Sequence, residues 1–294
     1  MVEKARGLNF LAYVVLILGI LVVGFPIYIS FVAASHDVSV FVSGQIPLLP
    51  GPHLIENISY AWTHGDLGSQ IINSLIIAGG ITLGKISISI LAAFAITYFD
   101  FKFRQTAFWI VFITLMLPVE VRIVPTYQVV ADIFSPVNTI LGLFGLHMNF
   151  SLSLLDSYFG LTVPLIASAT ATFLFRQFFL TVPDELAEAS KIDGASPMTF
   201  FRKILFPLSK TNIAALTVIT FVFGWNQYLW PLLITTDAKM RPIMVGIKQL
   251  IPAPDDPPTW NIAMAGSLVT ILPPILVVVL MQRWFIKGLI ENEK

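Results

Sequence analysis

The chain has 294 residues, of which 56% are hydrophobic and only 12% are charged, and its mean hydropathy is +0.83. These values exclude an ordinary soluble domain and indicate an integral membrane protein. The formal net charge is zero, which leaves no overall basic field for nucleic acid, and the absence of cysteine excludes disulfides, thiolate metal sites and cysteine nucleophiles.

Six apolar stretches are long enough to cross a bilayer, which takes a helix of roughly 20 residues. In chain order they run from Leu8 to Ala34, Ile71 to Phe99, Thr106 to Val130, Tyr158 to Phe179, Asn212 to Ile234 and Ile262 to Ile286. The first resembles a secretory signal because Lys4 and Arg6 precede it, but its apolar run is about twice as long as a usual signal core. We therefore predict an all-α integral membrane protein with six transmembrane helices and an uncleaved first span.

The basic residues predict the orientation of the spans, because Lys and Arg in short loops stay on the cytoplasmic side. Alternate connections hold Lys4, Arg6, Lys102, Arg104, Arg176, Lys191, Arg202, Lys203, Lys210, Arg283, Lys287 and Lys294. The opposite connections 35–70 and 128–157 contain neither residue type, and only the last outer loop, with Lys239, Arg241 and Lys248, departs from the pattern. Both termini, and the connection between the fourth and fifth spans, are therefore predicted to be cytoplasmic.

The second span contains "GGITLGK", Gly79 to Lys85, which has the glycine and lysine spacing of a phosphate-binding loop except that Ile86 follows it. Such a loop needs a preceding strand, whereas this run lies inside a continuous apolar stretch. We instead predict that Gly80 and Gly84 form a surface of small residues against another helix. Lys85 lies well inside the span, so its charge requires either a structural partner or a place on a substrate pathway.

The third span ends in "LPVEVRIVP", Leu117 to Pro125, which contains Glu120 and Arg122. Because these two residues are two positions apart, they face different sides of a helix and cannot easily neutralise each other. Each needs its own partner, water or ligand, unless both are solvated at the outer interface. Pro118 and Pro125 argue against a regular helix here.

The fifth span contains "GWNQYLWP", Gly224 to Pro231, and so places two amides, Asn226 and Gln227, among aromatic residues. Amides are poorly tolerated in lipid, so they should face either other helices or a pathway. The outer loop that follows includes "IPAPDDPPTW", residues 251–260, and is too rich in proline for a helix or a central strand.

The sixth span contains adjacent prolines, Pro273 and Pro274, which predict a bend. Metal-binding and nucleophile motifs do not occur in the sequence, so it offers no candidate catalytic centre. A secondary transporter or channel remains an alternative for such a bundle, although internal repeats typical of secondary carriers are not seen. An intramembrane enzyme is disfavoured because no acid–base constellation is available.

The connection before the fifth span is "DELAEASKIDGASPMTFFRKILFPL", Asp184 to Leu208. Thr181 and the residues after it predict a capped helix start, and Asp184, Glu185 and Glu188 lie where the positive end of the helix dipole favours acids. Gly194 is expected to end this helix in the left-handed conformation. Its small side chains suit close approach by a protein partner, although packing on its own bundle is an equal alternative.

A second helix is predicted after Ser196 and Pro197, with Pro207 at its end. One side of it carries Phe200, Phe201, Ile204 and Leu205. The connection therefore reads as two helices joined by a sharp glycine turn, held at the cytoplasmic surface.

The spacing Glu188-Ala189-Ser190, three residues, Gly194, nine residues, Ile204-Leu205-Phe206-Pro207 resembles the EAA loop of importers of the ATP-binding cassette class. Ser190 and Phe206 depart from that pattern while keeping size or apolarity. Further similar segments include "GLTVPLIASATATFLFRQFF", "GWNQYLWPLLITTD" and "MQRWFIKGL", so the likeness extends over nearly the whole chain. The connection 131–157 is longer than expected for the family.

The resemblance implies a single permease domain over residues 1–294, with a core importer fold at about 71–286 and a coupling loop at 181–209. It implies that the loop fits a cleft on an ATPase through Glu185, Glu188, Ala189, Ser190, Asp193, Gly194 and Ala195. The implied partners are a second related permease, an ATPase dimer that uses ATP-Mg, and an extracytoplasmic substrate-binding protein, all at a bacterial inner membrane. The chain itself is expected to be non-catalytic and to bind no cofactor.

Within the carbohydrate-uptake group of these importers, the resemblance implies transport of sn-glycerol-3-phosphate or a related glycerophosphodiester; another sugar or polyol is the alternative. A phosphate ester needs compensating donors along its path. The candidate pathway residues are Lys85, Glu120, Arg122, Asn226 and Gln227. The partner permease is a second possible holder of the substrate contacts.

Overall fold

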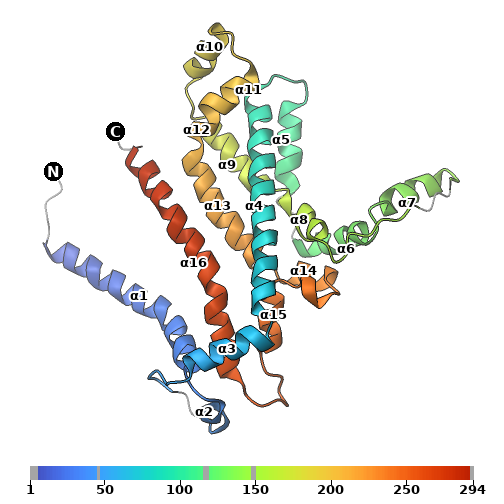
Figure 1. The fold of residues 1–294 in the computed structure, drawn as a ribbon. Helices are drawn as coiled ribbons and strands as arrows, with labels where there is room; N and C mark the ends of the chain where they lie inside the picture. Colours follow the sequence, from blue (N-terminus) through green and yellow to red (C-terminus); the bar gives the residue numbers. More distant parts are fainter. Residues whose placement is uncertain (1–5, 45–46, 115–118, 147–149, 292–294) are drawn as a thin grey trace. The chain divides into compact units, whose positions relative to one another are not determined.

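The computed structural model describes residues 6–44, 47–114, 119–146 and 150–291, and every regular element in these ranges is a helix (Figure 1). This confirms the predicted all-α class. The described residues form two compact units, one within 1–69 and 245–272 and the other within 70–244 and 273–294.

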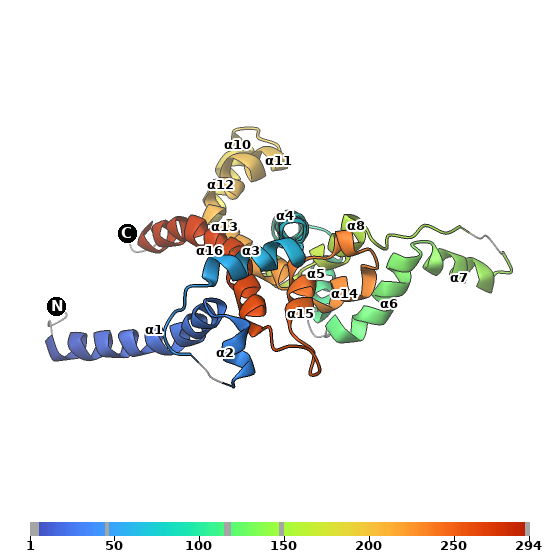
Figure 2. The ribbon, with the colours of Figure 1, turned by 60° about the horizontal axis from the view of Figure 1, so that its bottom comes forward.

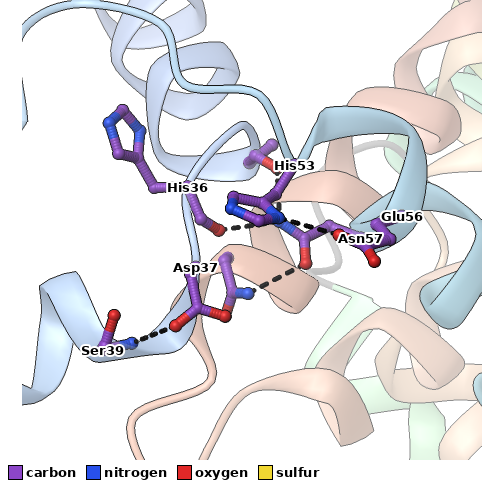
Figure 3. Close-up of polar contacts among 8 residues, drawn as sticks. His36, Asp37, Ser39, His53, Glu56 and Asn57 are labelled. Carbon is purple, nitrogen blue, oxygen red and sulfur yellow. Dashed lines mark hydrogen bonds and ion pairs between the residues drawn. The ribbon is translucent and has the colours of Figure 1, made fainter.

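The first unit is built from α1 (Arg6–Ala34), α2 (Val38–Val42), α3 (Leu54–His64), most of α15 (Ile243–Leu250) and the first part of α16 (Trp260–Glu291). The buried side chain of Asn57 is its polar centre (Figure 3). The amide of Asn57 donates to the carbonyls of Ala34 and His36, both at 2.8 Å, and accepts a bond from Asn261 at 3.0 Å. Asn57 thus fastens the end of α1 to α3 and to the start of α16.

Local polar contacts order the connection between α1 and α3 (Figure 3). Asp37 caps α2 by accepting the backbone N–H of Ser39 at 2.9 Å, and this hydrogen bond holds the pKa of Asp37 below its usual range. His53 precedes α3, and its Nδ1 lies 2.8 Å from the carboxylate of Glu56. Both side chains of this pair are exposed, so the pair adds little stability.

The second unit holds the remaining elements: α4 (Leu67–Tyr98), α5 (Arg104–Ile113), α6 (Val119–Ala131), α7 (Ser135–Leu143), α8 (Tyr158–Ile166), α9 (Ala169–Phe179), α10 (Asp184–Ile192), α11 (Pro197–Phe200), a π-helix (Phe201–Leu205), α12 (Phe206–Leu208), α13 (Lys210–Trp225), α14 (Leu229–Ile234), a 3-10 turn (Ala238–Met240) and the last part of α16. Helices α4, α5, α9 and α13 lie side by side, with α10 beyond one end of α4 and α14 toward the other (Figures 1 and 2).

Glycines set the close approach of α8 and α13 to α4. A Cβ added at Gly84 would lie 2.5 Å from Ile166 of α8, and one at Gly80 would lie 3.1 Å from Thr162. The predicted surface of small residues is therefore confirmed, and the run 79–85 is the middle of a helix and not a phosphate-binding loop. On α13, a Cβ at Gly224 would lie 2.9 Å from the backbone of Ala78.

Within the described ranges, three helices are long and apolar enough to cross a membrane, over Phe10–Ala34, Leu67–Tyr98 and Trp260–Trp284. Two bent pairs bring the number to five if each pair is one span. These pairs are Tyr158–Ile166 with Ala169–Phe179, bent by 47°, and Pro197–Leu208 with Lys210–Trp225, bent by 71°. The remaining predicted span, 106–130, corresponds to α5 and α6, and the residues between these two helices lie outside the described part of the chain.

One expectation about proline was wrong. Pro125 lies inside α6, so the segment 119–131 is helical even though this residue cannot donate a backbone hydrogen bond. Helix α16 continues through Pro273 and Pro274, and the bend expected there stays a prediction. Neighbouring turns keep their own hydrogen bonds, which is how apolar helices accommodate proline. The loop 251–259 contains no helix or strand, as predicted.

Asp156 joins the long connection 131–157 to the end of α14. Its carboxylate accepts the backbone N–H groups of Thr236 at 2.6 Å and Asp237 at 2.9 Å, and also the hydroxyl of Thr236. Its own N–H donates to Ile234 at 3.1 Å, and its φ is +50°. The hydrogen bond from the Thr236 side chain, followed by that from Asp237, lowers the pKa of Asp156.

We expect Asp156→Asn to lower the melting temperature of the purified protein by roughly 2–4 °C at neutral pH, as for loss of one capping carboxylate. A carboxyl group with a lowered folded-state pKa stabilises the fold above its unfolded pKa, and this contribution is lost as pH falls through the folded value. The difference between wild type and variant should therefore be constant above about pH 5 and vanish in acid. Asp255→Asn, in the exposed proline-rich loop, is the control; a difference that grows on acidification contradicts the assignment.

Candidate functional site

A cavity of about 450 Å³ lies among five helices of the second unit, α4, α5, α6, α9 and α13. Its size is within the range of small-molecule sites, roughly 300–1,000 Å³. It is lined by Lys85, Ile88, Ala92, Ile110, Val111, Thr114, Arg122, Ala167, Ser168, Ala169, Thr170, Thr172 and Phe223. Two of the predicted pathway residues, Lys85 and Arg122, therefore meet in one place.

Lys85 is buried, with 8% of its surface exposed, and its Nζ lies 3.7 Å from the centre of the Phe223 ring. In the described part of the chain Lys85 forms no ion pair with a carboxylate. A buried ammonium group needs compensation, and the face of an aromatic ring supplies part of it. The ring attracts the charge without cancelling it, so Lys85 keeps its capacity to bind an anion.

Arg122 lies on α6 with an exposed side chain and contributes the second cation of the cavity. Two like charges that share a cavity repel each other, and a bound anion would relieve that repulsion. Among the described lining residues, none is acidic. The side chain of the third candidate, Glu120, lies outside the described part of the structure.

The N-terminus of α9 forms one wall of the cavity. The chain leaves α8 at Ala167, and Ser168 caps α9 by accepting the N–H of Ala171 at 3.3 Å. Helix geometry leaves the N–H groups of Ala169 and Thr170 without intrahelical acceptors, at the positive end of the helix dipole. A helix N-terminus and two cations thus converge, which is an arrangement suited to an anion. Non-helical backbone at membrane depth is tolerated where it lines such a cavity.

Asn226 and Gln227 do not line this cavity. Asn226 is the exposed C-cap of α13, and Gln227 donates through Nε2 to the carbonyl of Phe223 at 3.1 Å. The hydrogen bond of Gln227 therefore serves its own helix and not a neighbouring one. Sequence reasoning missed Phe223, Thr114, Ser168 and Thr172. The only signal for Ser168 and Thr172 was a run of small and polar residues, "ASATAT", inside a predicted span, and Thr114 and Phe223 had none.

The predicted coupling loop begins with α10, which carries Asp184 and Glu185 in its first turn, as predicted. The expected capping by Thr181 was wrong, because its hydroxyl donates back to Phe178 of α9 at 2.7 Å and Pro183 takes the cap position without a side-chain bond. Proline supplies the fixed φ of a helix start, so a polar cap is not needed.

Gly194 ends this helix with φ +69°, as predicted. Its N–H donates to Lys191 at 3.0 Å, and the N–H of Ala195 donates to Ser190 at the same distance. The outer face of α10 is exposed at Glu185, Glu188, Ala189, Asp193 and Gly194, whereas Ser190 is buried and Ala195 is half-buried. Ile192 is 86% exposed, an apolar side chain with no cover within the chain.

The second helix fixes α10 to the bundle. Phe200, Phe201 and Leu205 are buried in a cluster that also contains Phe175 and Phe179 of α9, and Ile204 packs against it. The predicted apolar side is therefore confirmed. The expected end at Pro207 was wrong: the helix widens into a π turn at 201–205, passes through Pro207 to Leu208, and meets α13 after a 71° bend. The π turn satisfies the N–H of Phe206, which donates to Phe201 five residues back.

Comparison with known proteins gives a family and close relatives. Residues 85–291 match the family described as binding-protein-dependent transport system inner membrane component. The chain is 52% identical over 300 aligned positions, covering 100% of both chains, to proteins named sn-glycerol-3-phosphate transport system permease protein UgpE from Yersinia pestis bv. Antiqua and from Pectobacterium atrosepticum. The corresponding protein of Salmonella choleraesuis is 51% identical over the same length.

Solved structures support the fold. A chain of a bacterial ABC transporter involved in the import of the acidic polysaccharide alginate superposes with a TM-score of 0.75 at 18% identity, covering 97% of this chain and 99% of that one. The same kind of transporter in complex with an alginate-bound periplasmic protein gives a TM-score of 0.61 over 95% of each chain. With a matching family model over most of the sequence and full-length relatives, the chain belongs to the inner membrane components of binding-protein-dependent transport systems.

Proposed function

We propose that the chain is one of two permease subunits of an ATP-driven importer for sn-glycerol-3-phosphate or a related glycerophosphodiester. Relatives that match this chain over its full length are named as permease proteins of an sn-glycerol-3-phosphate transport system. The observation that carries the proposal is the cavity that joins Lys85, Arg122 and the N-terminus of α9, with no acid among its described lining residues. A phosphate monoester carries close to two negative charges at neutral pH, and leaving water requires such donors.

Helix α10 is the proposed coupling helix, seated in a cleft of a cytoplasmic ATPase. Its contact residues are Glu185, Glu188, Ala189, Ser190, Asp193, Gly194 and Ala195. Support comes from its exposed outer face and from the apolar anchor at 200–205, because a helix held firmly at its base transmits rigid-body motion to the span that follows it. Ile192, exposed at the tip, would be covered by the same cleft.

The assembly proposed around this chain has a second related permease beside it, an ATPase dimer that hydrolyses ATP-Mg below it and a substrate-binding protein outside. The solved alginate transporter bound to a periplasmic protein supports the last of these by its fold. In this proposal the chain itself is a non-catalytic, multi-pass protein of a bacterial inner membrane, with six spans and both termini in the cytoplasm. Asn226 and Gln227, which do not line the cavity, and Glu120, whose side chain is not described, remain predicted pathway residues.

The test is uptake into proteoliposomes that contain this chain, the second permease and the ATPase, with the binding protein added outside. We expect accumulation of labelled sn-glycerol-3-phosphate that requires both internal ATP and the binding protein, and no accumulation of a neutral disaccharide. Uptake driven by an ion gradient without the ATPase would assign the chain to secondary transport. ATP-dependent uptake of the neutral sugar alone would reject the phosphate ester.

A further inference from the structure

Arg176, like Lys85, is a cation that lies against an aromatic ring and forms no ion pair with a carboxylate among the described residues. It lies in the last turn of α9, and its guanidinium carbon is 4.3 Å from the centre of the Phe108 ring on α5. The Nε atom of Arg176 is buried and has no hydrogen-bond partner among the described residues. Buried guanidinium donors are normally satisfied, so the Nε of Arg176 is free to donate to a partner from outside the described residues.

The position of Arg176 continues the cavity toward the coupling loop. Thr172 lines the cavity, and Arg176 follows it by four residues on the same face of α9, about 6 Å further along the axis. On α5, Phe108 lies three residues before the lining residue Val111, on the same face of that helix. Arg176 is thus the next cation on the side of the cavity from which α9 leads into α10.

We propose that Arg176 forms a second anion-binding station, which takes the phosphate group of the substrate as it leaves Lys85 and Arg122 on the side of α10. This inference rests on the proposed function. A phosphate ester that leaves Lys85 and Arg122 loses their donors, and a further cation within reach would compensate its charge over the next step of the path. A guanidinium group offers two parallel donors to phosphate, and the Phe108 ring orients it without neutralising it.

The assembled importer carrying Arg176→Gln tests the station. At saturating substrate the uptake rate should fall about tenfold, which corresponds to the loss of one charge-assisted contact. The external concentration for half-maximal uptake should stay within about twofold, because the Lys85 cavity is intact. Arg176→Lys should retain much of the rate. Arg104→Gln, at the exposed start of α5, is the control and should be neutral.

Chemical rescue separates charge from packing. The chain contains no cysteine, so Arg176→Cys provides its only thiol. Attachment of an aminoethyl group through a thiosulfonate reagent should restore uptake at least about fivefold, and a sulfonatoethyl group of similar size should not. Full uptake by Arg176→Gln, or equal results with the two reagents, overturns the station. An importer carrying Lys85→Met, measured in the same assay, distinguishes failure of the Arg176 station from failure of the proposed function. Full uptake of the phosphate ester by Lys85→Met would reject the proposed pathway through the cavity.

Discussion

Importers carrying Gly194→Pro should lose substrate-stimulated ATP hydrolysis by at least about tenfold while the permease still inserts and binds its partner permease. Gly194 has φ +69°, and proline is fixed near −65°, so the turn after α10 must reorganise. Proline also removes the N–H that donates to Lys191. The measurement is the ATPase rate of the reconstituted complex with and without loaded binding protein.

A matched control for this variant exists within the chain. Gly145 has φ +77°, and its N–H makes the same kind of bond, to Gly142 at 3.1 Å, but it lies in the long connection 131–157. Gly145→Pro should leave the stimulation intact, so backbone strain alone does not account for the loss. Glu188→Lys, which keeps the backbone, should uncouple as well. Normal stimulation in Gly194→Pro, or an equal loss in the control, would rule out α10 as the coupling helix.

Lys85→Met should reduce uptake of the phosphate ester by about 100-fold, because the variant removes a desolvated cation from the cavity. Methionine keeps much of the length and the apolar stem of lysine, so packing against Phe223 persists. Arg122→Gln should cost less, about tenfold, because the side chain of Arg122 is exposed. Both effects are measured as initial uptake rates in proteoliposomes, normalised to the amount of assembled complex.

Lys102→Met is the control for Lys85, since Lys102 also lies over a ring, that of Phe103, but on an exposed loop. It should leave uptake unchanged. If Lys85→Met instead reduces assembly as much as uptake, then Lys85 is a structural partner of Phe223 and does not bind the substrate.

The sequence was most informative where a single local rule decides the conformation. Gly194 was identifiable as a helix end, and Gly80 and Gly84 as a packing surface, because a missing side chain allows what other residues forbid. The long apolar helices α1, α4 and α16 followed from length and composition alone. These features depend on residues close together in the chain.

The cavity could not be predicted, because it forms from helices that are distant in the sequence. Lys85 and Arg122 were both singled out, but nothing local indicates that they share a cavity with Ser168 and Phe223. The break between α8 and α9 contains neither glycine nor proline, and its local signals, the cap residue Ser168 and the preceding Pro164, did not stand out within a continuous apolar stretch. The continuation of α6 through Pro125 was missed because the expectation weighed one absent donor alone.

The π turn at 201–205 sets the direction in which α10 points. Its hydrogen bond joins the N–H of Phe206 to the carbonyl of Phe201, five residues back, whereas the bonds of an α-helix join residues four apart. Each residue rotates a helix by about 100° about its axis. The extra residue of the π turn therefore determines toward which side of α13 the helix α10 points. In a homologue shortened by a single residue here, α10 would point to another side of the bundle. The proposed coupling helix would then no longer face the proposed ATPase partner.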